Sequence, residues 1–141
     1  MNKFKALNSL FNTIRIGYLN ERKYTYHKNS KFIKDVVVLL LEHNLIVGYT
    51  VDKESFSIRI QLRYHNSRPI ILSHVIYKPS VKWVDSFMDV LPYYNDFDIF
   101  VISTSEGLIS SRDHWDLNHL NIRRGGYVLF GLNLLVGSLK H

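Results

Sequence analysis

Two stretches in the first half of the chain place apolar residues at every third or fourth position, which is the spacing of an amphipathic helix. They predict helices over residues 4–17 and 31–43. Asn29 and Ser30 can each accept a backbone N–H at the start of the second helix, and Asn44 can take the left-handed conformation at its end. These helices constrain the fold most, because each must bury its apolar stripe against another element.

Alternating apolar and polar residues predict strands beside the two helices. Residues 56–64 alternate over their whole length, which indicates an antiparallel strand with an exposed face that carries Arg59 and Arg63. Shorter segments at 23–27 and 45–51 also have the character of strands. The predicted order of the first half is therefore α-β-α-β-β.

The second half of the chain is predicted to be mostly β, with one short helix. A polar segment at 65–69 contains the first proline and separates the two halves. We therefore expect an α/β (α+β) protein with two small subdomains, an N-terminal one over residues 1–66 and a β-rich one over residues 67–141. The elements expected in the second are a short helix over 113–119 capped by Ser110 or Ser111, and strands over 70–77, 81–87 (ending near Pro92), 98–103, 107–109 and 127–134.

The composition indicates a soluble globular chain. With 141 residues, of which 46% are apolar and 21% charged, the chain is long enough to build its own core. It has no cysteine, which excludes disulfides, thiolate metal sites and a cysteine nucleophile. No apolar run is long enough to span a membrane, and the N-terminus has no apolar signal core. We therefore expect no membrane partner.

The charge of the chain suits a polyanionic partner, most simply a nucleic acid. The formal net charge is +6 and the pI is near 9.6. Residues 1–70 carry 12 Lys or Arg against 5 Asp or Glu, whereas residues 71–141 carry 6 against 7. The basic excess therefore lies in the N-terminal half.

Residue clusters that could support catalysis or a metal are weak. His114 and His119 are five positions apart, which is wrong for two ligands on one helical face. Four aspartates between residues 85 and 98 could hold Mg²⁺, but a solvated or partner-facing surface is the preferred interpretation. The glycine-rich motifs that cradle nucleotide phosphates do not occur. We therefore expect no cofactor and no small-molecule substrate.

Three hydroxyls in succession, at Ser103, Thr104 and Ser105, end a predicted strand just before Glu106 and Gly107. Hydroxyls and exposed backbone N–H groups suit phosphate, ribose 2′-OH and base edges, which makes this segment a candidate RNA-binding loop. As a hydrolase nucleophile, Ser105 would need a glycine two positions before it and a helix after it. A turn of small polar residues is the remaining possibility.

Several segments, in order along nearly the whole chain, resemble the bacterial-type ribosomal protein S8 family. The most specific is residues 102–109, followed by Arg112 and by the paired glycines 125–126 before a terminal apolar strand. Others resemble the end of the family's first helix, its second helix and its basic turn, at 14–17, 30–46 and 78–82. The resemblance implies a two-subdomain α/β protein that binds the central domain of small-subunit rRNA and helps to assemble the subunit, with neighbouring small-subunit proteins as further partners.

The resemblance also implies individual RNA contacts. The family's hydroxyl loop corresponds to Ser103, Thr104 and Ser105, with Gly107 and Gly126 beside it. The other implied contacts are Thr13, Arg15, Ser30 and Lys31 in the N-terminal half, Lys78 and Lys82 on either side of the basic turn, and Arg112.

The chain departs from the family at four positions and by an insertion. Where the family usually has Lys, Glu, Tyr and Asn, this chain has Glu106, Tyr127, Val84 and Ile16. We expect these changes to alter which bases the protein contacts, and to have less effect on where the protein sits on the RNA. Arg123 and Arg124, in the insertion between Arg112 and Gly125, would restore some attraction for phosphates.

Alanine is almost absent from the chain, which contains only Ala6, and residues with AT-rich codons take its place. This bias indicates an AT-rich genome, such as that of an organelle. We therefore expect a structural, rRNA-binding protein of the small subunit of the mitochondrial ribosome, acting in translation without catalysis, with the plastid or bacterial ribosome as alternatives. A small serine hydrolase using Ser105 and a basic interaction module without dedicated RNA are the alternative functions.

Overall fold

The computed structural model describes residues 2–78, 83–85, 87–112 and 125–135. The chain divides into two compact units, the first containing residues up to Ile71 together with Leu135, and the second containing residues 72–134. The expected N-terminal α/β subdomain over 1–66 and β-rich subdomain over 67–141 remain a prediction. Predictions that fall on residues 79–82, 86, 113–124 and 136–141 lie outside the described residues, and these include the short helix expected over 113–119.

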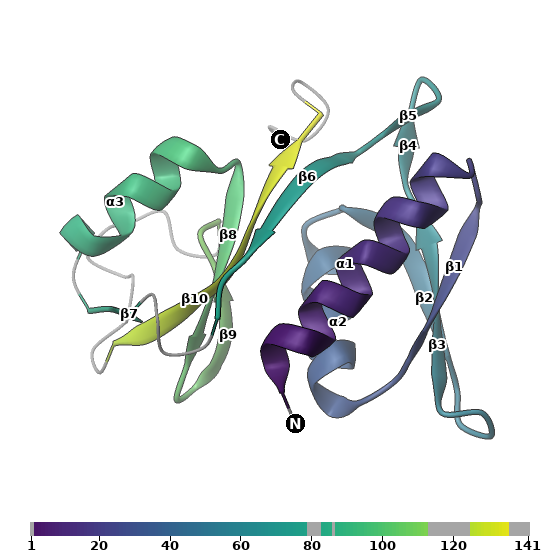
Figure 1. Ribbon diagram of the computed structural model, residues 1–141, viewed down its shortest axis with the longest axis horizontal. Helices are drawn as coiled ribbons and strands as arrows, with labels where there is room; N and C mark the ends of the chain where they lie inside the picture. The colour runs from purple at the N-terminus through teal and green to yellow at the C-terminus, as the bar shows by residue number, and fades with distance from the viewer. Residues whose placement is uncertain (1, 79–82, 86, 113–124, 136–141) are drawn as a thin grey trace. The chain divides into compact units, whose positions relative to one another are not determined.

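The first unit has the predicted order of helices and strands (Figure 1). Its helices begin at capping side chains, because Asn2 Oδ1 accepts the Lys5 N–H and Ser30 Oγ accepts the Ile33 N–H. Asn44 has φ +60° just after the second helix, as expected for the residue that ends it. The elements are α1 (Lys3–Leu19), β1 (Tyr24–Lys28), α2 (Lys31–Glu42), β2 (Ile46–Asp52), β3 (Ser57–Leu62) and a short hairpin of β4 (Tyr64–His65) and β5 (Arg68–Pro69).

The sheet of the first unit is antiparallel, with β3 between β1 and β2. On β3, Ile58, Ile60 and Leu62 are buried, whereas Arg59 between them is exposed. This is the alternation predicted from the sequence, and it leaves one face of the sheet for the helices, since α1 contacts β1 and β3 and α2 contacts β2. Gly17 lets α1 approach the sheet, because a Cβ there would lie 2.8 Å from Leu62 Cδ1.

The second unit is built on a sheet in which β10 runs between β6 and β8, with β9 at the far edge. The two-residue strand β7 also pairs with β10. The elements are β6 (Ile71–Ile76), β7 (Trp83–Val84), α3 (Phe87–Asp96), β8 (Ile99–Thr104), β9 (Gly107–Ser110) and β10 (Gly126–Leu134). The core beside α3 contains Val84, Val90, Phe100, Ile102 and Val128.

The strand expected over residues 81–87 is present as β7 (Trp83–Val84), but the expectation that it ends near Pro92 is wrong, because α3 spans Phe87–Asp96 and contains Pro92. The helix is stabilised by the burial of Val90, with Tyr93, Tyr94 and Phe97 packed on the same core at helical spacing. Its start is stabilised by the carboxylate of Asp89, whose Oδ2 accepts the Asp85 N–H at 3.2 Å. These contacts offset the loss of one helical hydrogen bond, which Pro92 cannot make because it has no backbone N–H.

Candidate RNA interface

The three expected hydroxyls lie at the turn between β8 and β9, but they do not have the same role. Thr104 Oγ1 donates to the Gly107 carbonyl at 2.9 Å and accepts the Glu106 N–H at 3.2 Å. Its hydroxyl therefore shapes the turn. Ser105 is exposed and Ser103 is half-buried, so these two side chains remain accessible to a partner. Contact of all three residues with RNA remains a prediction.

Gly107 has φ +117°, in the left-handed region that favours glycine. A Cβ at this position would have no neighbour within 4 Å, so the requirement for glycine comes from the backbone conformation and not from lack of space. Gly107 therefore shapes the loop through its backbone conformation.

Gly126 meets a different requirement, because β10 lies very close to β8 at this point. A Cβ on Gly126 would lie 2.7 Å from the Ser103 carbonyl oxygen and 2.7 Å from Ile102 Cγ2. Only glycine fits without moving one of the two strands. Gly126 therefore acts on the loop through the position of Ser103.

The N-terminal candidates lie on the two helices of the first unit. On α1, Thr13 Oγ1 donates to the Ser9 carbonyl at 2.8 Å, and the exposed Arg15 donates through Nη2 to Asn12 Oδ1 at 2.7 Å. On α2, Ser30 caps the helix and Lys31 is exposed in its first turn.

These four N-terminal residues do not form one cluster. Lys3 Nζ lies 5.3 Å from the centre of the Phe32 ring, which places the start of α2 beside the first turn of α1. Thr13 follows Lys3 by ten residues, so it lies about 15 Å further along the helix axis. The first unit therefore offers two separate points of contact.

Two further predicted contacts, Lys78 and Arg112, belong to described parts of the second unit. Lys78 is exposed just after β6, and the Arg112 N–H donates to Ser110 Oγ at 2.9 Å after β9. Lys82, Arg123 and Arg124 lie outside the described residues. Within the second unit, the structure therefore brings together the loop residues Ser103, Thr104, Ser105 and Gly107 with Gly126.

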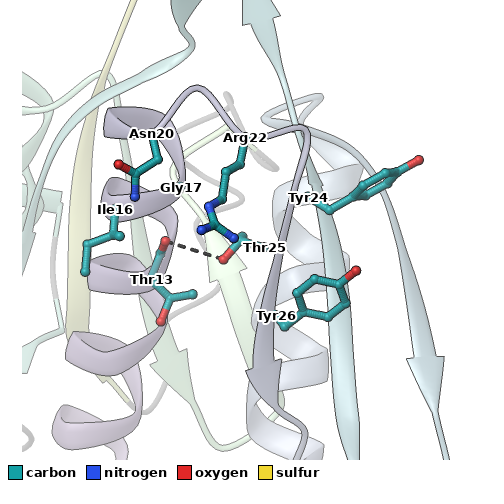
Figure 2. A pocket seen from close by; sticks show the side chains of 8 residues that line it. All are labelled: Thr13, Ile16, Gly17, Asn20, Arg22, Tyr24, Thr25 and Tyr26. Carbon is teal, nitrogen blue, oxygen red and sulfur yellow. Dashed lines mark hydrogen bonds between the residues drawn. The ribbon is translucent and has the colours of Figure 1, made fainter.

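A pocket of about 310 Å³ between α1 and β1 adds residues that sequence reasoning missed. Thr25 Oγ1 donates to the Thr13 carbonyl at 3.4 Å across it. Figure 2 shows Arg22 reaching between the helix and the strand toward Thr25. Arg22 follows the helix in a turn and has no periodic signal, so only the fold shows that it lies near Thr13.

A half-exposed aromatic pair in the second unit was also missed. Trp83 on β7 is 47% exposed, and its ring centre lies 4.6 Å from that of Tyr127 on β10. The only available signal was a tryptophan in a short segment of strand character, and this does not identify its neighbour.

The described residues give no support for a metal centre or a membrane helix. Within the described ranges, no three His, Asp or Glu side chains are grouped so that they could hold a metal ion. The carboxylates between residues 85 and 98 are exposed, and Asp98 Oδ2 accepts the Leu134 N–H at 2.8 Å. None of the helices in the described part of the chain is long and apolar enough to cross a bilayer.

The sequence of this α+β chain matches a known class of ribosomal proteins. The sequence profile of the family described as Ribosomal protein S8 matches residues 6–130. The chain therefore belongs to the ribosomal protein S8 family, as its sequence segments indicated. Because this family consists of structural proteins, the expectation that the chain is not an enzyme is confirmed, and the alternative of a serine hydrolase using Ser105 is wrong.

Individual relatives can be aligned with this chain over most of their length. The small ribosomal subunit protein uS8 of Ehrlichia canis (strain Jake) is 32% identical over 124 residues, which cover 85% of this chain and 90% of the relative. The protein of the same name from Ehrlichia chaffeensis is 30% identical over 124 residues, with the same coverage. That of Anaplasma marginale (strain Florida) is 28% identical over 123 residues, which cover 84% and 89%.

Proposed function

We propose that this protein is a structural constituent of the small ribosomal subunit and binds small-subunit rRNA through the β8–β9 hairpin. The observation that carries the proposal is that the loop has a fixed shape and accessible hydroxyls, in a chain that belongs to this family. Thr104 and Gly107 hold the turn in shape, while Ser103 and Ser105 remain accessible for hydrogen bonds to 2′-OH and phosphate groups. Hydroxyls held in a defined loop can make the shape-dependent contacts to 2′-OH and phosphate groups by which folded RNA is recognised.

The test is binding of a fragment from the central domain of small-subunit rRNA. Replacing Ser103 and Ser105 together with alanine leaves the bonds of Thr104 intact, so the turn keeps its shape. If each hydroxyl contributes about 1 kcal/mol, the double variant should bind about 30-fold more weakly. The matched control is Ser73→Ala, a substitution of another exposed serine in the same unit. If the double variant binds as tightly as this control, the loop is not the RNA contact.

The N-terminal unit supplies a second, electrostatic part of the proposed interface. Arg15 and Lys31 are exposed on separate helices in the half of the chain that holds the basic excess. Their separation suits two points along a phosphate backbone better than one bound ion. The exposed carboxylates between residues 85 and 98 would repel phosphate, and we assign that surface to a basic neighbouring protein.

The source of the ribosome is a finer part of the proposal. The scarcity of alanine indicates an AT-rich genome, and a mitochondrial ribosome is the assignment that we propose. The relatives above come from bacteria, which leaves the bacterial and plastid ribosomes as the competing assignments. Sedimentation of the tagged protein with small subunits from purified mitochondria of its source cell would support the assignment. Recovery only with ribosomes of another compartment would overturn it.

A further inference from the structure

One row of side chains crosses the sheet of the second unit from Trp83 to the hydroxyl loop. Tyr127 on β10 is directly opposite Trp83 on β7, and it is also directly opposite Ser103 on β8. Ser103 in turn is opposite Leu108 on β9. Residues directly opposite each other in antiparallel strands point to the same face of the sheet. The four side chains therefore share one face.

This face is the one that α3 does not cover. The neighbour of Trp83 along its strand, Val84, is 1% exposed and belongs to the core beside α3, together with Ile102 and Val128. Because successive side chains of a strand point to opposite faces, Trp83 and Tyr127 point away from that core. The indole is 47% exposed as a result.

The indole of Trp83 is held in place from two sides. A Cβ at Gly125 would lie 2.1 Å from Trp83 Cζ2, so the six-membered ring rests directly on the backbone at Gly125, which has φ +78°. The ring of Tyr127 lies 4.6 Å from it, centre to centre, at an interplanar angle of 64°. These contacts leave the indole little freedom to change rotamer, so its exposed surface is presented in a defined orientation.

A half-exposed aromatic pair beside accessible hydroxyls has the chemistry of a nucleobase site. An unpaired base can stack on the indole or the phenol ring, and such stacking does not depend on the identity of the base. The strands are spaced by about 4.8 Å, so Trp83 and Ser103 are about 10 Å apart across the row. A nucleotide whose base stacks on the aromatic pair can therefore bring its sugar and phosphate to the serine hydroxyls.

We propose that Trp83 and Tyr127 stack an unpaired nucleobase of the RNA that the hydroxyl loop binds. The inference rests on the proposed function, because the loop supplies the adjoining contact. RNA is favoured as the occupant over a protein segment because the aromatic row runs without a break into Ser103. It implies that the RNA site includes a bulged or looped nucleotide, since the bases of a continuous duplex cannot reach a side chain in this way.

The fluorescence of Trp83 provides a direct test. The chain has two tryptophans, Trp83 and Trp115, so the Trp115→Phe variant contains Trp83 alone. Titration of this variant with the rRNA fragment should change the fluorescence emission until the signal saturates. The RNA concentration at half-saturation should equal that found in an electrophoretic binding assay. A version of the fragment in which every nucleotide is paired should leave the emission unchanged.

Affinity measurements complete the test. Stacking of one base corresponds to a loss of about 5- to 150-fold in affinity when the aromatic ring is removed, which is the range expected for Trp83→Ala. Trp83→Phe keeps a stacking ring and should recover most of the loss. The control is Met88→Ala, because Met88 is 70% exposed on α3, which packs on the opposite face. Circular dichroism shows whether each variant is folded.

The outcomes separate this inference from the proposed function. Two results together would show that the stacking site is wrong. The fragment would bind folded Trp83→Ala with unchanged affinity, and it would leave the emission of the Trp115→Phe variant unaltered. The proposal for the hydroxyl loop would still stand. An emission change that requires a neighbouring ribosomal protein instead of RNA would also overturn the stacking site. If the parent chain binds no rRNA fragment, both proposals fail.

Discussion

Replacing Gly126 with alanine should destabilise the second unit, because β10 and β8 leave no room for a methyl group there. The new Cβ would lie 2.7 Å from the Ser103 carbonyl oxygen, whereas ordinary contact begins at 3.4 Å. One strand must therefore move by about 0.7 Å, and the atom in the way is backbone and cannot rotate aside. Overpacking of this kind typically costs about 1–3 kcal/mol of the free energy of unfolding.

The matched control is Gly48→Ala on β2. A Cβ at Gly48 would meet nothing within 4 Å, and Gly48 is not among the glycines with positive φ. This substitution should change the free energy of unfolding by less than about 1 kcal/mol, and in the stabilising direction, because alanine restricts the unfolded chain. Urea unfolding followed by circular dichroism measures both variants.

The reasoning would be refuted if Gly126→Ala unfolded at the same urea concentration as Gly48→Ala. Such a result would mean that β10 can shift from β8 without loss of packing. A shift that preserved stability should still move the Ser103 carbonyl, so rRNA binding by the folded variant supplies a second readout.

Three further predictions concern other parts of the chain. Burial raises the pKa of Tyr18 to about 12, so the unfolded chain releases this proton near pH 10 while the folded chain keeps it. Up to about 2–3 kcal/mol of stability should therefore be present below pH 10 and lost between pH 10 and 12, and Tyr18→Phe should remove that part of the pH dependence in unfolding titrations. Neutralising Arg15 or Lys31 should lower the slope of log affinity against log salt by roughly 0.7–0.9 per lost phosphate contact, and an unchanged slope would show that the side chain is only solvated. Gly107→Val should weaken rRNA binding more than Glu106→Ala, because a β-branched residue at φ +117° is strained by about 1–3 kcal/mol, and equal binding by the two folded variants would contradict this.

The helices of the first unit were predictable because their signals are local. Periodic apolar residues, the capping side chain of Ser30 and the left-handed Asn44 act within a few positions of each other. The strand β3 was predictable for the same reason, since alternation along one segment already indicates which face is buried. Family segments spread along the chain then identified the class of protein.

The helix α3 could not be predicted because its local signals pointed elsewhere. Pro92 argues against a helix interior, and the valines before it have the propensity of strands. Only the core of the second unit, where Val90 is completely buried, gives the helix the burial that compensates for the proline.

The sequence by itself determined the α+β class, the family and the candidate hydroxyl loop, since each depends on neighbouring residues or on motifs in order. Three facts were decided only by the tertiary structure. The Thr104 hydroxyl bonds within the turn, the Ser103 carbonyl oxygen lies too close to Gly126 for a side chain there, and the Trp83 ring packs against Tyr127. The physical reason is that these three facts depend on turn conformation and strand register. Register joins residues far apart in the chain through backbone hydrogen bonds that all residues can form, and these leave little trace in the identity of any one of them.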